Sequence, residues 1–319
     1  MNARTDDQLA AAFEAERPYL RRLAYGTLGS IAEADDVVQE AWLRLQRAEA
    51  AEIRELRAWL TTVVGRLALD ALDSARVRRE RYVGPWLPEP IVETAGSDAA
   101  LGPVAVGAET RALGEDPADR ATLADEVTTA LLVVLERLSP AERTAFVLHD
   151  VFGLPFQDVA EVVGRSPAAV RQLATRARRH VEEGTPRFPA SHEEHSGVVA
   201  AFAAAWMDGD LDGLLAVLDP DVTFRSDGGG KVVAAREPQH GADHVARLLL
   251  SFEHSAQRQR GHARGGIVDV NGLPGLVFRD RDVTTVISFT VDRGRITAID
   301  AVRNPDKLRH VRLPPLPEL

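Results

Sequence analysis

The sequence predicts a multi-domain protein in which two all-α helical domains, the second with a helix-turn-helix, are followed by an α+β domain. Three observations predict this class. Apolar side chains recur at helical spacing up to residue 183, interrupted by an acidic stretch rich in Pro and Gly. A short helix, a glycine turn and an arginine-rich helix follow one another near the end of that part. Beyond residue 190, helical patterns give way to strand-like runs, an order typical of an α+β domain.

Length and composition set the outer limits. The chain has 319 residues, enough for two or three domains, and it has no cysteine, which excludes disulfides, zinc–cysteine sites and a cysteine nucleophile. No apolar run approaches the ~20 residues that span a bilayer, and the N-terminus lacks the apolar core of a signal peptide. We therefore expect a soluble, cytoplasmic protein with no membrane partner.

The distribution of charge matters more than its sum. The formal net charge of −10 argues against a nucleic-acid partner. Between Tyr82 and Ala130, however, nine acids face only two bases, a local charge of −7, while basic residues gather at Arg76–Arg81 and Arg165–Arg179. Local patches decide phosphate binding. One hypothesis is that the acidic stretch competes with DNA for the basic helices.

Composition shifts divide the chain into four parts. Residues 1–81 form a first helical domain, and residues 82–118 form an acidic Pro/Gly linker. Residues 119–183 form a second helical domain, and residues 190–319 form the α+β domain with a C-terminal tail.

In the first part, Ser30 and Glu33 have the spacing of a capping box that starts a helix. Val38, Trp42 and Leu45 then form one apolar stripe. A further helix begins near Leu56 and runs into the basic cluster that starts at Arg76.

In the third part, an amphipathic helix from Leu123 to Leu138 precedes a second capping box, Ser139 to Glu142, whose helix should end near Gly153. A short helix, Phe156 to Val163, should stop at Gly164, and Ser166 should cap the next helix. The inner face of that last helix carries Val170, Leu173, Ala174 and Ala177, and its outer face carries Arg171, Gln172, Thr175, Arg176, Arg178 and Arg179. Arg and Gln on such a face can bond to base edges in a major groove.

The last part should contain helices first and an antiparallel sheet after. The expected elements are helices His195–Met207, Leu211–Leu218 and Ala242–His254, and strands Val222–Arg225, Gly275–Arg279, Val283–Val291 and Arg295–Val302. The tripeptide Asp292–Gly294 marks a hairpin. His192 and His195 flank two glutamates and are expected to be exposed. His240 and His244 are four apart, but Gly241 stands where a zinc protease needs Glu, so no metal or cofactor is expected.

Three segments resemble those of the extracytoplasmic-function (ECF) sigma factors. Ala34–Arg44 is similar to that family's polymerase-binding helix, and Leu56–Asp70 to the helix that opens and reads the minus-ten element. Leu138–Arg179 is similar to the domain that reads the minus-thirty-five element. The three lie in the family's order and cover most of residues 6–183. The resemblance implies an alternative RNA polymerase sigma factor that directs promoter-specific transcription initiation and is not an enzyme.

Three further motifs resemble a subgroup with a SnoaL-like domain, the curved-sheet cone of ketosteroid isomerases, fused behind the sigma domains. In that subgroup, the resemblance implies, the extra domain contacts the linker and tunes activity in cis. The motifs are Trp86-Leu87-Pro88-Glu89-Pro90, Asp227-Gly228-Gly229-Gly230-Lys231 and Asn304-Pro305-Asp306-Lys307-Leu308. Read without the resemblance, the glycine motif is a flexible loop after a strand. It is no phosphate loop, because Val232 follows Lys231 where Ser or Thr is needed.

The resemblance also assigns roles to residues in the helical domains. Its polymerase-binding positions are Asp36, Gln39, Glu40, Trp42 and Arg44. Its promoter-binding positions are Arg66, Asp70, Arg76, Arg78, Arg79, Arg171, Gln172, Thr175, Arg176 and Arg179. The alternative for the first set is a solvated acidic face with Trp42 in the core. The alternative for the cluster at Arg76–Arg79 is a basic helix end that complements the macrodipole.

Two other functions remain open from the sequence. The cone could hold a small-molecule ligand as a sensor, or act as an isomerase or cyclase, which needs a carboxylate base and an oxyanion site. Asp227, Asp269, Asp282 and Asp300 are candidates for that base, with nothing to choose among them. A simple helix-turn-helix regulator would leave residues 30–81 unexplained. The expected partners are therefore core RNA polymerase, promoter DNA and the chain's own SnoaL-like domain.

Overall fold

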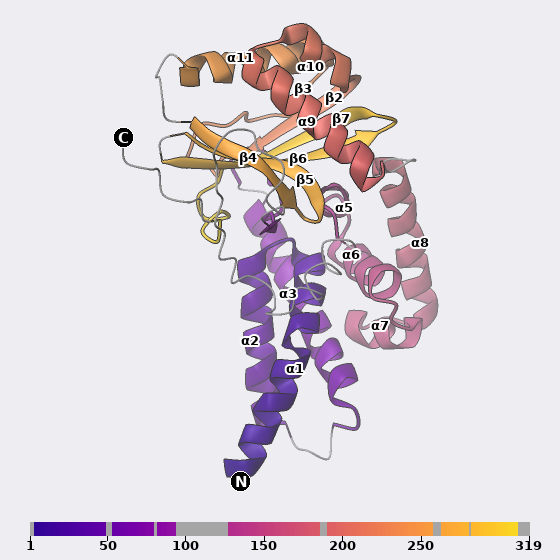
Figure 1. The fold of residues 1–319 in the computed structure, drawn as a ribbon. Coiled ribbons are helices and arrows are strands. Elements are labelled where there is room, and N and C mark those ends of the chain that lie inside the picture. Colours follow the sequence, from indigo (N-terminus) through magenta and orange to yellow (C-terminus); the bar gives the residue numbers. More distant parts are fainter. Residues whose placement is uncertain are drawn as a thin grey trace. The chain divides into compact units, whose positions relative to one another are not determined.

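In the computed structural model of the chain, the structure describes residues 3–48, 53–79, 82–93, 127–185, 190–257, 263–280 and 282–311 (Figure 1). These residues fall into two compact units. The first holds the described residues up to 79, with 127 and 131–184, and the second holds 82–93, 128–130 and the described residues from 185 onward. The start of the expected linker thus belongs with the sheet. The expected bounds of the four parts, residues 1–81, 82–118, 119–183 and 190–319, remain proposals.

The first unit begins with three packed helices. They are α1 (Ala3–Leu28), α2 (Ile31–Arg47) and α3 (Leu56–Arg79). As expected, Ser30 caps α2: its Oγ accepts a hydrogen bond from the Glu33 N–H at 3.2 Å. The apolar stripe of α2 is buried against its neighbours, with Val38 and Leu45 at 0% and 1% exposure.

Four further helical segments follow, and apart from the first two residues of α5 they belong to this unit. They are α5 (Thr129–Leu135), α6 (Pro140–Phe146), α7 (Phe156–Val163) and α8 (Pro167–Gly184). The Ser139–Glu142 capping box forms in both directions, and Gly164 ends α7 at a φ of 68°. Beyond α6 the chain continues as one π-helical turn, Val147–Val151, which carries it to Gly153. The first amphipathic helix is shorter than expected, because Leu138 lies beyond its end.

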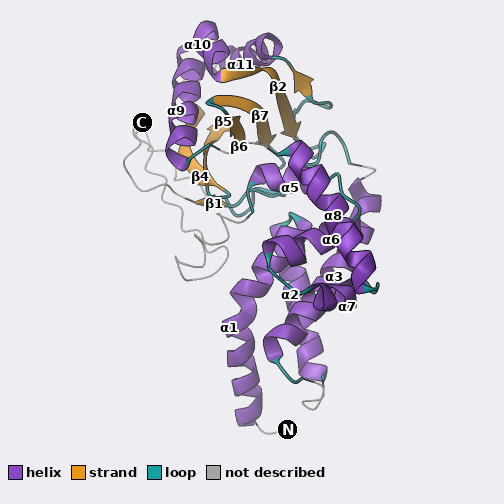
Figure 2. Ribbon diagram, turned by 90° about the vertical axis from the view of Figure 1, so that its right-hand side faces the viewer, coloured by secondary structure: helices purple, strands orange, loops and turns teal. Residues whose placement is uncertain are grey.

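The second unit is a mixed sheet covered on one face by helices (Figure 2). The strand order is β1-β4-β5-β6-β7-β2-β3, and among the strands that the structure describes only β2 and β7 pair in parallel. The strands are β1 (Val92–Glu93), β2 (Leu218–Asp227), β3 (Gln239–His240), β4 (Ala263–Val270), β5 (Leu273–Asp280), β6 (Val283–Asp292) and β7 (Arg295–Val302). The helices are α9 (His192–Asp208), α10 (Leu211–Val217) and α11 (Ala242–Gln257). The expected class, two helical domains and a SnoaL-like α+β domain, is confirmed.

Aromatic side chains fill the space between these helices and the sheet. Phe202 packs edge-on against Phe289, with ring centroids 4.9 Å apart. Trp206 meets Phe278 in the same way at 5.3 Å, and its indole N–H donates to the Leu249 carbonyl at 3.1 Å. The surrounding strand residues are aliphatic and buried. The interior of the cone is therefore a packed core.

Local signals placed most of these strands and helices correctly. The expected hairpin joins β6 to β7 through Arg293 and Gly294, both with positive φ. The strands β1, β3 and β4 were not predicted from the sequence. The expectation that His195 is exposed was wrong, because only 3% of its surface is accessible to solvent. The His195 Nε2–H donates to the Pro274 carbonyl at 3.1 Å, and burial lowers the pKa of the imidazole.

Within the described ranges, none of the helices combines the length and apolar character that a membrane crossing requires.

Candidate functional site

The outer face of α8 presents the predicted DNA-reading residues to solvent. Arg171, Gln172, Thr175 and Arg176 line a surface hollow of about 380 Å³, while Val170 and Leu173 on the opposite face are buried. Arg179 is exposed one turn further on. A helix with one buried apolar face and one exposed basic face is the form that enters a major groove.

Acidic side chains neutralise part of this basic face. Arg176 lies 3.1 Å from the carboxylate of Glu142, and Arg178 pairs with Asp150. Arg179 pairs with Glu183 along the helix at 3.0 Å. No acid occurs between Arg165 and Arg179 in the sequence, so the first two pairs arise only from tertiary packing. DNA phosphates would have to compete with these carboxylates for the same guanidinium groups.

Arg171 is held differently, by the ring of Phe156. Its guanidinium lies 5.3 Å from the ring centroid, and the imidazole of His149 stacks on the same ring at 3.7 Å. The π-helical turn carries His149 to this position. Its Nδ1 must carry the proton, because the partner at 2.7 Å is the Leu154 carbonyl, which only accepts. The stack orients Arg171 without neutralising it.

The predicted polymerase-binding residues lie along the outer side of α2. Asp36 and Gln39 are exposed. Glu40 and Arg44 form an ion pair along the helix at 3.1 Å, exposed on both sides. Trp42 is half-buried against Phe13, with ring centroids 5.0 Å apart. The face combines the exposed Asp36 carboxylate and the Glu40–Arg44 pair with a partly accessible indole, an arrangement that suits docking to a polar or amphipathic protein surface.

The predicted minus-ten helix, α3, packs against α7 inside the same unit. A Cβ atom on Gly65 would lie 2.9 Å from a methyl of Val162, so only glycine permits this approach. The next residue, Arg66, donates from Nε and Nη2 to the Glu161 carbonyl at 3.2 and 3.0 Å. Asp70 is exposed. The side chains of Arg76, Arg78 and Arg79 lie outside the described residues.

A buried carboxylate joins the linker to the α+β domain. We call the residues Tyr82, Leu87, Asp227, Asn304 and Lys307 the linker clasp. The side chain of Asp227 is 0% exposed. It accepts from the Tyr82 hydroxyl at 2.6 Å, the Leu87 N–H at 2.9 Å and the Lys307 ammonium at 2.8 Å. Asn304 donates to the Tyr82 oxygen at 2.8 Å. These four hydrogen bonds therefore join Tyr82 and Leu87 of the linker to Asp227, Asn304 and Lys307 of the α+β domain.

The Lys307 ammonium has further partners in the linker. It donates to the Leu87 carbonyl and lies 3.8 Å from the centroid of the Trp86 ring. Burial, followed by the hydrogen bond to the Asp227 carboxylate, raises the pKa of Tyr82. The phenol therefore remains a hydrogen-bond donor. Within the described residues, the cation and the anion of the clasp are both buried and paired.

The glycine motif after Asp227 fits closely beneath the C-terminal motif. A Cβ on Gly229 would lie 2.3 Å from the Asn304 side chain, and φ at Gly229 is 61°. A Cβ on Gly228 would lie 2.4 Å from the Val232 carbonyl, and Gly230 approaches Val83 of the linker. Outside the buried part, Lys231 pairs with Asp306, which follows the exposed Pro305.

The remainder of the predicted linker motif continues into the sheet edge. Pro88, Glu89 and Pro90 are buried, and the Pro90 carbonyl accepts from His310 at 2.8 Å. Residue Ile91 then donates to the Asn271 side chain at 3.1 Å and accepts from its N–H at 2.8 Å. Strand β1 follows and pairs with β4.

The candidate carboxylates of the enzyme hypothesis have different surroundings. Asp227 belongs to the clasp, and Asp300 is bound to Arg225, with Nη2 at 3.0 Å. Burial raises the pKa of Asp300, against the effect of Arg225, and burial also raises the pKa of the half-buried Asp269. Asp282 is exposed. No group of three metal-ligating side chains occurs within the described part of the chain.

Sequence reasoning missed several of these participants. Tyr82 precedes the linker motif, and Asn271 lies in a β-turn. Phe156 looked like an ordinary first residue of a helix. Aromatic and amide residues of this kind show no local sequence pattern that indicates their role, because their partners are distant in sequence.

Two known protein families match the two helical parts of the chain. The family model for Sigma-70 region 2 matches residues 12–78, and that for Sigma-70, region 4 matches residues 128–181. These are the two helical segments that carry the exposed faces of α2, α3 and α8. The fold and these two family matches therefore define a sigma factor, a class that is not enzymatic and that binds core RNA polymerase and promoter DNA.

More specifically, the chain belongs to the ECF RNA polymerase sigma factors. It is 41% identical to the ECF sigma factor SigJ of Mycobacterium tuberculosis over 303 residues, 92% of this chain and 91% of SigJ. It is 40% identical to the probable ECF sigma factor SigI of the same species over 309 residues, 96% of this chain and 97% of SigI. The crystal structure of SigJ matches 96% of this chain and 100% of its own, with 38% identity and a TM-score of 0.73.

Proposed function

We propose that this ECF sigma factor is regulated in cis by its SnoaL-like domain, and that the linker clasp is the regulatory contact. The single observation that carries the proposal is the buried Asp227 carboxylate, which binds linker groups and Lys307 together. A buried, fully paired carboxylate costs several kcal/mol to expose alone, so the clasp forms or breaks as a unit. We propose that this closed arrangement and an open one are the two states of a switch.

The clasp restrains the segment that connects the two DNA-binding domains. Region 2 ends near residue 78 and region 4 begins near residue 128, and residues 82–93 between them are bound to the sheet domain. A sigma factor must reach the minus-ten and minus-thirty-five elements together. We therefore propose that the closed clasp limits this reach and that its opening raises promoter output.

The residue roles follow from the same family. We propose that Arg171, Gln172, Thr175, Arg176 and Arg179 contact the minus-thirty-five element. Arg66, Asp70, Arg76, Arg78 and Arg79 would contact the minus-ten region, and Asp36, Gln39, Glu40, Trp42 and Arg44 would dock on core polymerase. The proposal is supported by exposure: apart from the partly buried Glu40 and Trp42, the described members of each set are exposed. A factor with these partners is expected in the cytoplasm, where the polymerase works.

Run-off transcription with purified core polymerase tests the regulatory proposal. Lys307→Met opens the clasp, and Lys231→Met, which removes only an exposed ion pair, is the matched control. We expect a severalfold rise in output from the cognate promoter with Lys307→Met and no change with the control. Equal output from both variants, with equal binding to core polymerase, would exclude the clasp as the regulatory contact.

A further inference from the structure

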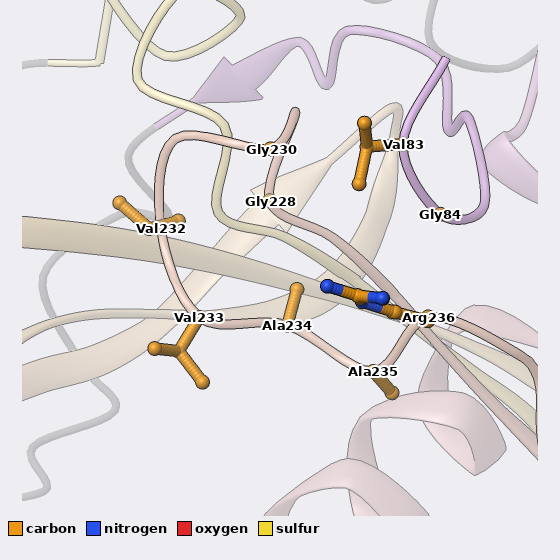
Figure 3. A pocket seen from close by; sticks show the side chains of 9 residues that line it. All are labelled: Val83, Gly84, Gly228, Gly230, Val232, Val233, Ala234, Ala235 and Arg236. Carbon is orange, nitrogen blue, oxygen red and sulfur yellow. The ribbon is translucent and has the colours of Figure 1, made fainter. Parts of the chain in front are cut away.

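A hollow of about 280 Å³ lies beside the linker clasp and outside the packed cone (Figure 3). Two segments form it: the linker turn Val83–Gly84, and the loop from Gly228 to Arg236 that follows the glycine motif. Both belong to the second unit. A space of this size holds roughly nine water-sized groups at ~30 Å³ each. It suits a small organic molecule rather than a cofactor.

Apart from Arg236, the residues that line the hollow are valine, alanine and glycine, and polar backbone atoms of the loop share the surface with them. Val83 is 54% exposed and points into the hollow, whereas Val233, which is 83% exposed, points away from it (Figure 3). Ala234 and Ala235 extend the same surface. Apolar side chains that are gathered around a hollow and left open to water indicate a ligand or partner site.

One charged side chain lines this hollow. The guanidinium of Arg236 turns back across the loop, between Ala234 and the linker turn (Figure 3). Neighbouring cations have partners: Lys231 pairs with Asp306, and Lys307 pairs with Asp227. Within the described part of the chain, no ion pair or side-chain hydrogen bond engages Arg236. A single unneutralised guanidinium over an apolar wall attracts one anionic group.

The loop that presents Arg236 is anchored. Arg303 donates from Nη1 to the Val233 carbonyl, and the N–H groups of Lys231 and Val232 both donate to the Gly228 carbonyl. At its start the loop is fixed by Asp227 of the clasp. The hollow is thus largely formed before any ligand arrives, which lowers the entropic cost of binding.

From these features we infer that the hollow binds a small monocarboxylate with an apolar body, the carboxylate on Arg236 and the body against Val83 and Ala234. A polyol finds no side-chain acceptors there, and a phosphate would meet only one cation. Such a ligand would touch the linker turn and the sheet domain together. Its effect on transcription rests on the proposed function of the clasp, but its binding does not.

Calorimetry on the full-length chain, without polymerase or DNA, tests the inference. The probes are 4-methylpentanoate and benzoate, and the neutral 4-methylpentanamide is the matched control ligand. We expect saturable binding of a carboxylate with a Kd of about 1 mM or tighter, and at least tenfold weaker binding of the amide.

Two variants locate the site. Arg236→Gln removes the charge, and Val83→Asp places a like charge in the apolar wall; each should weaken carboxylate binding at least tenfold. Arg247→Gln, an exposed arginine of α11 with 62% side-chain exposure, should bind like the parent chain. The inference is overturned if no carboxylate binds saturably, if the amide binds equally well, or if Arg236→Gln binds as the parent does. These results do not depend on whether clasp variants alter transcription.

Discussion

The ammonium of Lys307 lies 3.8 Å from the centroid of the Trp86 ring, so two motifs more than two hundred residues apart meet face to face. The same ammonium is bound to the buried Asp227 carboxylate. A cation that is stripped of water gains more from a carboxylate and an aromatic face than an exposed one does. This contact makes the linker part of the SnoaL-like domain.

Removing the clasp cation should destabilise the second unit strongly. In the closed clasp, Lys307→Met would leave Asp227 buried without its counter-ion, which lowers the free energy of unfolding by about 3–5 kcal/mol and therefore favours opening of the clasp. Adding Asp227→Asn to that variant should recover part of the loss, because no uncompensated charge then remains. Chemical denaturation of the single and double variants measures this coupling.

The control for that experiment is Lys231→Met. Its partner Asp306 is exposed, and such surface pairs contribute about 0–1 kcal/mol. Equal destabilisation by Lys231→Met and Lys307→Met would show that the buried pair has no special weight.

Arg171 should contribute to promoter recognition through its position on Phe156. We expect Arg171→Ala to weaken binding to the cognate promoter by about 1–3 kcal/mol and to leave binding to core polymerase intact. Phe156→Leu keeps the charge but removes the ring and should have a smaller effect in the same direction. Fluorescence anisotropy with promoter DNA measures both. Unchanged affinity in Arg171→Ala would contradict the placing of the recognition helix.

Separating α3 from α7 should raise DNA affinity. Gly65→Ala sets a Cβ atom 2.9 Å from Val162, and overpacking of this kind costs roughly 1–3 kcal/mol at the contact. Loss of the contact frees Arg66 from the Glu161 carbonyl. We therefore expect tighter promoter binding in a gel-shift titration.

The second-site change Val162→Ala tests the cause of that effect. It removes the methyl groups that the new Cβ would meet, so the double variant should return towards the parent affinity. If Gly65→Ala tightens binding by the same factor with and without Val162→Ala, the effect arises from helix propensity instead.

His195 should make the second unit sensitive to acid. Burial lowers the pKa of this imidazole in the folded chain, and the nearby His192 adds to the effect. The contribution of the neutral ring is present above the unfolded pKa of about 6.5 and is lost as pH falls through the lower folded value. We expect the fall in stability from pH 7.5 to pH 5 to be smaller in His195→Gln.

The Gln side chain can still donate a hydrogen bond to the Pro274 carbonyl but does not titrate. The variant therefore removes the titrating group without removing the hydrogen bond. Urea unfolding at both pH values supplies the comparison. An identical slope in the parent and His195→Gln would contradict this assignment.

The sequence by itself determined the helix caps, several helix bounds and the buried helix faces of this protein, because these features depend on local patterns. The capping box at Ser139, the helix from Phe156 to Val163 and the αL cap at Gly164 all form as expected, because their bonds join residues within a few positions. The buried face of α8 follows from helical spacing alone. The three motifs in series likewise indicated the ECF sigma family, which the comparisons confirm.

Tertiary structure decided the contacts between distant segments. Strand β1 is two residues long and exists only because β4, far along the chain, supplies its partner. His195 looks exposed beside two glutamates, yet the start of β5 covers it. Arg176 and Arg178 acquire acidic partners from other segments, and Asp227 acquires Tyr82. Periodicity reports which face of one element is apolar, whereas the identity of the covering group depends on how the whole chain closes.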